Sequence, residues 1–205
     1  MMGERRKTLQ NIVCISGTSR PNNYTSRALT VVVDELQTRQ LETTVFDGRE
    51  ITLSFPGYPG TEDAERLQAA VKASAGVVLA TPEYHGGFSA MTKLILENMG
   101  FPSVLKRKPV ALLGVAAGRI GAIKSLEQLR GICAHTGALV LPSSVSIAGV
   151  QRAFDEDGRC TDSGVESSLR GLAEGLEEFI QDYVCPKFAL EDLVRGDDRP
   201  WIASV

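Results

Sequence analysis

Residues 11–25, NIVCISGTSRPNNYT, decide the fold class of this chain. The first six residues form an apolar run that ends at Gly17, which is the pattern of a buried parallel strand. A polar loop follows, and the next apolar side chains recur at helical spacing: Ala28, Leu29, Val32, Val33 and Leu36. The segment therefore predicts a strand, a loop and a helix in succession.

The same alternation repeats along most of the chain. Further strands are predicted at residues 41–47, 76–81, 109–115 and 138–141, and Pro82 is expected to stop the second of these. Further helices are predicted from about Thr61, from an N-cap at Ser89 to Asn98, from Ile123 to Cys133, and from a capping box of Ser163 and Glu166 to Tyr183. Strands that alternate with helices predict an α/β fold with a parallel sheet and helices on both faces.

Length and composition bound the remaining possibilities. The chain has 205 residues, of which 43% are hydrophobic and 23% charged, so one domain with a sizeable core is expected. We expect an N-terminal tail at residues 1–10, a folded domain at residues 11–184 and a C-terminal tail at residues 185–205. A net charge of −3 gives no reason to expect binding to nucleic acid. The start of the chain lacks a signal-peptide pattern and no stretch is long enough to span a bilayer, so a cytoplasmic location without membrane contact is expected.

Cysteine and histidine are few and scattered. The four cysteines are far apart and form no Cys-x-x-Cys pair, so separate reduced thiols are expected. The chain has only two histidines, which argues against a multi-histidine metal site, and no metal is expected.

Candidate binding residues lie in the loop that follows the first strand. Ligands of open α/β sheets bind beyond the carboxyl ends of the strands, and residues 17–25 lead from such an end to the N-terminus of a helix, where unpaired amides attract an anion. Its side chains offer further donors and one cation: Thr18, Ser19, Asn23, Thr25 and Arg20. The loop lacks the glycine pattern of a Walker A loop or of G-x-G-x-x-G. An ordinary polar turn is the alternative.

Two later loops offer close backbone approach. Residues 81–89, TPEYHGGFS, contain two glycines and the ring of Tyr84, which suits a flat ligand. Residues 116–121, AAGRIG, combine small side chains with Arg119, which can meet an anionic edge or a phosphate. For both loops, a tight turn without a ligand is an equally good account of the glycines.

The second loop also has to be considered as the nucleophile motif of a hydrolase. Residues 87–91 contain half of a G-x-S-x-G elbow but lack its closing glycine, and His135 is the only histidine that follows Ser89. A helix cap is the better account of Ser89. Neither His85 nor His135 is assigned a proton-transfer role.

Together the three loops resemble those of the NADPH-dependent FMN reductase family, and the resemblance runs from about Asn11 to Tyr183. It implies a flavodoxin-like three-layer sandwich whose five-stranded parallel sheet has the order 2-1-3-4-5. It also implies an FMN-dependent oxidoreductase that takes hydride from NADPH or NADH and reduces free flavin, quinone, azo or similar acceptors by a ping-pong mechanism. No catalytic side chain is required, because N5 of FMN carries the hydride.

The resemblance further implies which residues bind the cofactor. The FMN phosphate is expected among Thr18, Ser19, Arg20, Asn23, Tyr24 and Thr25. The isoalloxazine ring is expected along Pro82, Glu83, Tyr84, His85 and Gly86, with Gly118 and Arg119 closing the other side. Either Arg20 or Arg119 is a candidate for the 2′-phosphate of NADPH.

Two other functional classes remain open, together with the assembly state. A non-enzymatic electron carrier of the flavodoxin type is disfavoured by the modest net charge and by Arg20 in the phosphate loop. A flavin-binding regulatory module is the second alternative. The resemblance implies a homodimer or homotetramer that pairs through helices beside the flavin loops, and the candidate apolar residues are Met91, Leu94, Ile95 and Met99.

Overall fold

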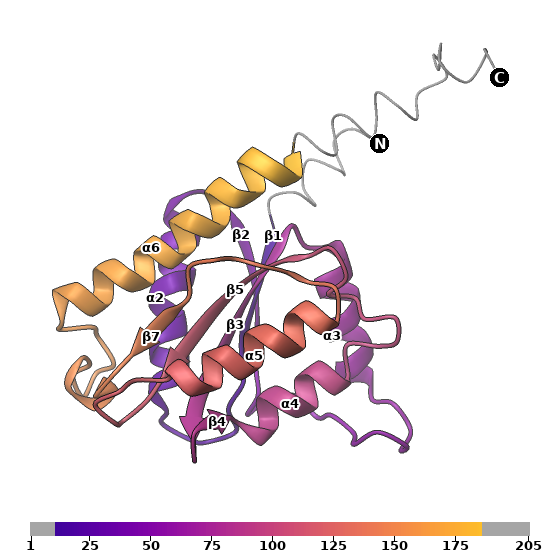
Figure 1. Ribbon diagram of the computed structural model, residues 1–205, viewed down its shortest axis with the longest axis horizontal. Helices are drawn as coiled ribbons and strands as arrows, with labels where there is room; N and C mark the ends of the chain where they lie inside the picture. Colours follow the sequence, from indigo (N-terminus) through magenta and orange to yellow (C-terminus); the bar gives the residue numbers. More distant parts are fainter. Residues whose placement is uncertain (1–10, 186–205) are drawn as a thin grey trace, which may run out of the picture.

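The computed structural model describes residues 11–185, which form a three-layer α/β sandwich (Figure 1). The central parallel sheet has the order β2-β1-β3-β5-β6, which confirms the predicted order of five strands. Two short strands bring the sheet to seven, because β4 pairs with β3 and β7 pairs with β5. The strands are β1 Asn11–Ser16, β2 Glu42–Asp47, β3 Gly76–Tyr84, β4 Gly87–Phe88, β5 Pro109–Val115, β6 Leu139–Val140 and β7 Val145–Ile147.

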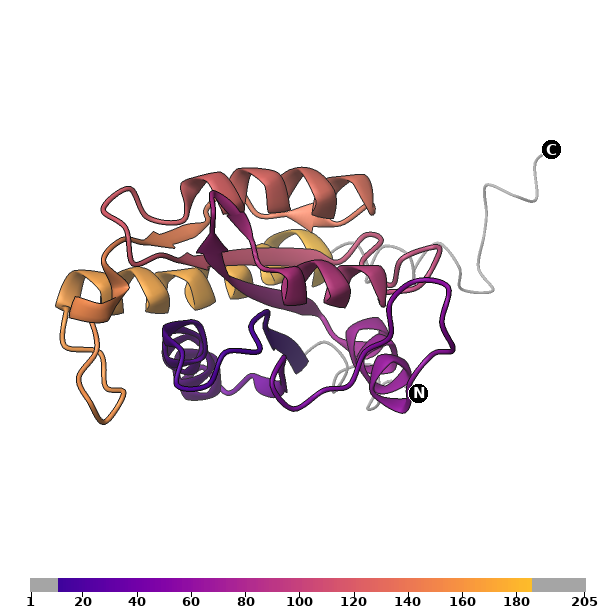
Figure 2. The same cartoon turned by 90° about the horizontal axis from the view of Figure 1, so that it is seen from below.

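Within the described residues, five α-helices cover the two faces of the sheet (Figures 1 and 2). Helices α2 (Tyr24–Thr38) and α6 (Ser163–Phe179) pack on one face, and α3 (Glu62–Ala73), α4 (Ala90–Glu97) and α5 (Ile123–His135) pack on the other. Successive residues of β1 enter opposite cores, as the two-residue period of a strand requires: Cys14 faces α2 and α6, whereas Val13 faces the other three helices. The strand is buried on both sides, which explains its unbroken apolar sequence.

Strand β3 runs past Pro82 to Tyr84, so the prediction that Pro82 ends the strand is wrong. Pairing between β1 and β3 stops at Ala80, and beyond that residue β3 has a parallel neighbour on one side only. Pro82 lies opposite Val115 of β5, and a residue without an N–H is tolerated where one side of a strand is free. The chain then turns back as β4, so that the segment predicted to be a loop is mostly strand and hairpin.

The sheet edge formed by β6 and β7 also differs from the predicted single strand at residues 138–141. The expected strand at residues 138–141 is reduced to β6, and β7 continues the same edge after an interruption. β6 pairs with the start of β5 and β7 pairs with its end. Pro142 lies in the interruption, where it removes a donor from the ladder. β7 was not predicted, because three residues are too few to show the two-residue alternation of a strand.

Helix ends follow their capping residues. Thr61 and Ser89 are the N-caps of α3 and α4, as predicted. For α6 the prediction is wrong by one residue, because Asp162 is the N-cap in place of Ser163. Its carboxylate accepts the amides of Gly164 and Val165 at 2.9 and 3.1 Å, and a negative charge there also complements the helix dipole.

The far end of α6 changes its helical period. The buried stripe of Leu169, Leu172 and Leu176 confirms the predicted apolar face. From Ile180 to Val184 the chain continues as a π-helical turn, and Tyr183 is 66% exposed rather than part of the stripe. The wider turn rotates this side chain out of phase with the residues before it. The predicted tails, apart from Cys185, lie outside the described residues.

No helix within the described part of the chain is both long enough and apolar enough to cross a membrane.

Candidate functional site

The three predicted loops meet in one cleft of about 460 Å³ at the carboxyl edge of the sheet. A cleft of this size is within the range that holds cofactors, and it opens beside β1 and β3, where the strand order reverses. Its lining is drawn from four segments: Arg20, Asn22, Asn23, Tyr24 and Thr25; Pro82, Glu83 and Tyr84; Val115, Ala116 and Ala117; and Val150 and Gln151.

Seven of the predicted site residues line this cleft: Arg20, Asn23, Tyr24, Thr25, Pro82, Glu83 and Tyr84. The other six do not line it. Thr18 is buried beneath the first loop, whereas Ser19, His85 and Arg119 are exposed. Gly86 lies at the tip of the β3–β4 hairpin, and Gly118 follows the lining residue Ala117.

The sequence interpretation missed Asn22, Val115, Ala116, Ala117, Val150 and Gln151. Asn22 and the two alanines belong to loops that were singled out for other residues, so their positions were available to the argument. Val150 and Gln151 carry no comparable signal. They lie in a short 3-10 helix, Val150–Arg152, that reaches the cleft only because β7 pairs with β5.

The first loop is braced by its own side chains. Asn23 is the N-cap of α2 and accepts the Ser26 amide at 2.7 Å, while its Nδ2 donates to the Arg20 carbonyl at 2.8 Å. The Thr18 hydroxyl accepts the Arg20 amide at 3.2 Å. Because the first amides of a helix have no intrahelical acceptor, those of Tyr24 and Thr25 are available to an anion in the cleft.

Buried hydroxyls connect the first loop to the second. Ser89 and Thr92 both donate to the carbonyl of Gly17, the latter at 3.0 Å. Thr92 Oγ1 also lies 3.0 Å from Thr81 Oγ1, and Thr81 accepts the Ser89 amide at 3.2 Å. The Ser89 hydroxyl is therefore occupied as a helix cap and as a donor inside the protein, which rules it out as an exposed nucleophile.

Gly17 is required by this packing. A Cβ atom there would overlap Thr92 Oγ1 and would lie 2.8 Å from the carbonyl oxygen of Ala80. The Gly17 amide donates to that same carbonyl at 2.8 Å, so the strand cannot move away without losing the bond. Because Gly17 has no side chain, the chain can leave β1 and enter the first loop directly beside Ala80 and Thr92.

The β3–β4 hairpin is fastened to α5 at two points. The Ser125 amide donates to Glu83 Oε2 at 3.0 Å, and the Gln128 side-chain amide donates to the Gly86 carbonyl at 3.0 Å. The N-cap residue of α5, Ala122, supplies no side-chain bond, so Glu83 acts as the cap of that helix from another element. His85 and Gly86 both have positive φ, at 52° and 75°, which is the conformation of a two-residue type I′ turn.

Residues that follow β7 contact α2 at Tyr24, which lines the cleft. The ring centroids of Tyr24 and Phe154 are 6.2 Å apart, and the Arg27 guanidinium lies 5.2 Å from the centre of the Tyr24 ring. Arg27 also donates to the carbonyl of Asp155 at 2.9 Å. These contacts fix Tyr24 from two sides and join the segment after β7 to the α2 side of the cleft.

The family is decided by a sequence match over most of the chain. Residues 10–152 match the model of the NADPH-dependent FMN reductase family. The chain belongs to this family. It is therefore an NAD(P)H-dependent oxidoreductase with FMN and NADPH as its cofactors, which confirms the resemblance seen in the three loops.

Known proteins agree with this assignment. The chain is 26% identical over 178 residues to an FMN-dependent NADPH-azoreductase of Staphylococcus aureus, covering 82% of this chain and 94% of that protein. Among solved structures, it resembles the flavoenzyme NAD(P)H:acceptor oxidoreductase FerB of Paracoccus denitrificans with a TM-score of 0.70, at 22% identity over 85% of this chain and 99% of that one. It also resembles an NADH:FMN oxidoreductase in its apo form, with a TM-score of 0.68, at 18% identity over 82% and 89% of the two chains. The structural likenesses establish the flavodoxin-like fold.

The cleft of this family member fits FMN in shape and in donors. The open N-terminus of α2 and the exposed Arg20 suit the phosphate. Tyr84 is 42% exposed and offers its ring along one wall, and the small side chains of Ala116 and Ala117 permit close approach on another. The cofactor assignment therefore agrees with the residues present.

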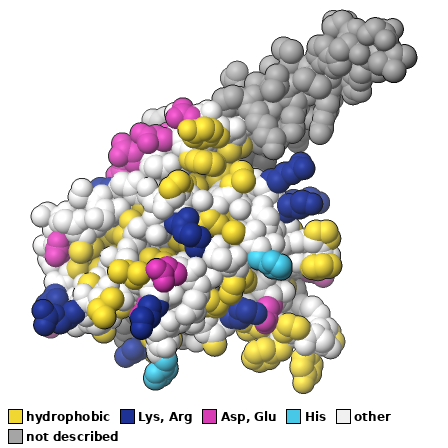
Figure 3. Space-filling model, viewed as in Figure 1, with side chains coloured by type: hydrophobic (Ala, Val, Ile, Leu, Met, Phe, Trp, Pro, Cys, Tyr) yellow, Lys and Arg dark blue, Asp and Glu magenta, His cyan; other side chains and the backbone are white. Residues whose placement is uncertain are grey.

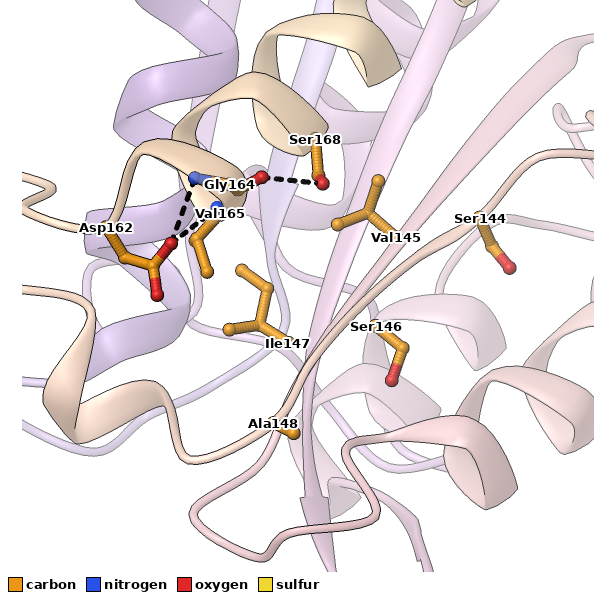
Figure 4. A pocket seen from close by; sticks show the side chains of 9 residues that line it. All are labelled: Ser144, Val145, Ser146, Ile147, Ala148, Asp162, Gly164, Val165 and Ser168. Atoms are coloured by element: carbon orange, nitrogen blue, oxygen red, sulfur yellow. Dashed lines mark hydrogen bonds between the residues drawn. The ribbon is translucent and has the colours of Figure 1, made fainter.

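A second hollow of about 540 Å³ lies between β7 and α6 of the reductase (Figure 4). Three of its four polar side chains are already engaged in hydrogen bonds within the protein. Asp162 caps α6, Ser168 donates to the Gly164 carbonyl at 2.8 Å, and Ser146 accepts the Ala122 amide at 2.8 Å. This hollow is larger than the cleft but offers a ligand few free partners, so size alone does not locate the site.

The two buried thiols of the enzyme are not candidate nucleophiles. All four cysteines are free, as predicted. Burial raises the pKa of Cys14 and that of Cys133 to about 12, so both remain protonated at neutral pH. Ile95 and Met99, two of the residues proposed for subunit pairing, are fully buried within this chain, which leaves Met91 and Leu94 as the partly exposed members of that set.

Proposed function

We propose that the enzyme works by a ping-pong mechanism in which NADPH and then a small electron acceptor occupy the same cleft. One observation carries the proposal: three loops converge on a single cleft that is open on one side, which provides one place for both substrates. We further propose that the acceptor is free flavin, a quinone, an azo compound or a similar flat molecule. The azoreductase name of the Staphylococcus aureus relative supports that class of acceptor.

The protein's own part in this reaction is to bind and to orient. The α2 amides and Arg20 would hold the FMN phosphate, and the predicted contacts of Thr18, Ser19, Asn23 and Thr25 belong to the same proposal. The hairpin from Pro82 to Gly86 would wall the ring, with Gly118 and Arg119 opposite. When bound, FMN supplies the redox chemistry, since its N5 takes hydride from the nicotinamide and the electrons then pass to the acceptor.

An electron carrier of the flavodoxin type is the second candidate, because the fold alone permits it. A flavodoxin of Streptococcus pneumoniae resembles the chain with a TM-score of 0.56 at 15% identity. The distribution of charge favours the reductase. On the face shown in Figure 3, acidic and basic side chains are interspersed with hydrophobic ones, and neither sign covers the face as a docking surface for a charged redox partner would require.

Spectroscopy and two-substrate kinetics test the proposal. Protein reconstituted with FMN should lose its flavin absorbance under anaerobic NADPH and regain it when a quinone is added. Initial rates measured against both substrates should give parallel double-reciprocal lines. Intersecting lines would exclude the ping-pong order, and NADPH oxidation only with an added reductase would favour the carrier. Protein that takes up no FMN would favour a regulatory module.

A cytoplasmic location and a homodimer or homotetramer remain parts of the same proposal. Light scattering of the purified full-length chain tests the assembly, and a monomer at working concentration would contradict it. Cell fractionation tests the location.

A further inference from the structure

The arginines of the described chain fall into two groups. Those of the first group bind a carboxylate or a backbone carbonyl: Arg27, Arg39, Arg49, Arg66, Arg130, Arg159 and Arg170. Within residues 11–185, the side chains of the second group have no such partner: Arg20, Arg107, Arg119 and Arg152. Arg20 lines the cleft, Arg152 directly follows the lining residue Gln151, and Arg119 comes two residues after the lining residue Ala117.

Arg119 and Arg152 are brought together by a backbone junction. The Gly149 amide donates to the Gly118 carbonyl at 3.0 Å, which joins the loop after β5 to the loop after β7. The Arg152 side chain folds back against Gly149, where a Cβ atom would overlap its Nη2 and lie 3.4 Å from its Nε. The guanidinium of Arg152 therefore lies beside Gly149, and Gly149 is bonded to Gly118, the residue that precedes Arg119.

The carboxylates nearest to Arg152 in the chain do not neutralise it. Asp155 Oδ1 accepts the Arg159 amide at 2.7 Å, and Asp157 pairs with the Arg159 guanidinium at 3.4 Å. Across the cleft, the Glu83 carboxylate is engaged by the Ser125 amide. Neither Arg119 nor Arg152 forms an ion pair with a carboxylate of residues 11–185, so two unpaired arginines follow the cleft-lining residues Ala117 and Gln151.

We infer that Arg119 and Arg152 bind the 2′-phosphate of NADPH and make the enzyme prefer NADPH to NADH. A phosphomonoester carries a charge of about −1.5 to −2 at neutral pH, which matches two guanidinium groups, and guanidinium presents several N–H donors to phosphate oxygens. Arg20 lies beside the α2 N-terminus that suits the FMN phosphate, so the two phosphates are served by different arginines. The inference rests on the proposed use of NADPH at this cleft.

Charge-removing variants with a matched control test the inference. Arg119→Gln and Arg152→Gln each remove one of the two positive charges, and Arg107→Gln removes an equally unpartnered charge next to the start of β5, at the opposite edge of the sheet. The KM for NADPH should rise about fivefold in each of the first two variants and about twentyfold in the double variant, as expected for exposed charged contacts. The KM for NADH should change less than twofold in Arg152→Gln, which lies outside the proposed FMN contacts, and Arg107→Gln should leave the KM for either nucleotide unchanged.

A binding measurement gives a readout that does not depend on turnover. Calorimetry on the unmodified chain should detect 2′,5′-ADP more tightly than 5′-AMP, and the double variant should lose that difference. Equal weakening of NADPH and NADH, or equal binding of the two adenosine phosphates by the wild type, would overturn the inference. Failure of the proposed function is distinguishable, because a protein that oxidises neither nucleotide can still be scored by its binding of 2′,5′-ADP.

Discussion

Replacing Gly17 by alanine should strongly destabilise the protein, because the fold leaves no room for a side chain at this position. The new Cβ would overlap Thr92 Oγ1 and would lie 2.8 Å from the Ala80 carbonyl oxygen. The Thr92 side chain can rotate away, but it would then lose its bonds to the Gly17 carbonyl and to Thr81. Ala80 belongs to the centre of β3 and has no room to move.

These losses set the magnitude. Overpacking of a rigid site costs about 1–3 kcal/mol, and each lost buried hydrogen bond adds about 0.5–1.5 kcal/mol. With two such bonds lost, the free energy of unfolding should therefore fall by about 2–6 kcal/mol, a large share of the 5–15 kcal/mol that is usual for a domain. Urea denaturation of the apo protein, followed by circular dichroism, measures the change as a shift in midpoint at constant slope.

The matched control is Gly131→Ala, within α5, where a new Cβ meets nothing within 4 Å. The same chemical change should there stabilise the protein by about 0.5–1 kcal/mol through helix propensity. Thr92→Ala in the Gly17→Ala background removes the hydroxyl overlap and should recover part of the loss. A Gly17→Ala protein whose free energy of unfolding stays within about 0.5 kcal/mol of the wild type, the usual range of a harmless surface change, would falsify the steric argument.

Three further predictions concern other contacts of the site and the sheet. Glu83→Ala should lower the free energy of unfolding by about 1–2 kcal/mol because it uncaps α5, and it should raise the Kd for FMN in fluorescence titrations. Glu83→Gln keeps an acceptor for the Ser125 amide, so its loss of stability should be less than half as large. Equal losses of stability in the two variants would contradict the capping role. Burial lowers the pKa of Lys108 from 10.5 to about 8, so the unfolded chain binds more protons at this lysine between these values, and the contribution of Lys108 to stability should rise with pH from 8 to 10.5, against the fall above pH 9 that the buried thiols of Cys14 and Cys133 cause. Lys108→Met should remove about 1–3 kcal/mol of that rise in denaturation series across this range, and a variant with the same pH profile as the wild type would refute it. His85→Asn should raise the thermal midpoint by a degree or more because asparagine favours the positive φ of a type I′ turn, and a lowered midpoint would argue that the His85 side chain makes contacts of its own.

The fold was accessible from the sequence because apolar runs and capping residues report local structure. The buried strand at residues 11–16 and the caps at Thr61 and Ser89 are examples in which local chemistry and tertiary packing agree. Pro82 was misinterpreted because its usual effect assumes neighbours on both sides, and the pairing with β1 ends two residues earlier. A rule about one residue cannot include the length of a strand that lies elsewhere in the chain.

The site was accessible only in part, and for a related reason. The phosphate loop carries its own signal, since polar residues follow a buried strand and precede a helix. Glu83 lines the cleft, and its carboxylate also caps α5 over a separation of 42 residues, a role that no local pattern predicts. Val150 and Gln151 reach the cleft through the pairing of β7 with β5, which no local pattern announces.

The hydroxyls that connect Gly17 with Thr81, Ser89 and Thr92 have a consequence for ligand exchange. Both walls of the cleft are tied together by bonds inside the protein, so their backbone entropy is lost when the chain folds and not when a ligand arrives. A cofactor that leaves such a cleft does not unravel it, and the next one meets loops that are already in place. FMN should therefore bind and dissociate without a slow conformational step, and its binding should cause only a small change in heat capacity. The apo protein should remain folded after one FMN leaves and before the next one binds.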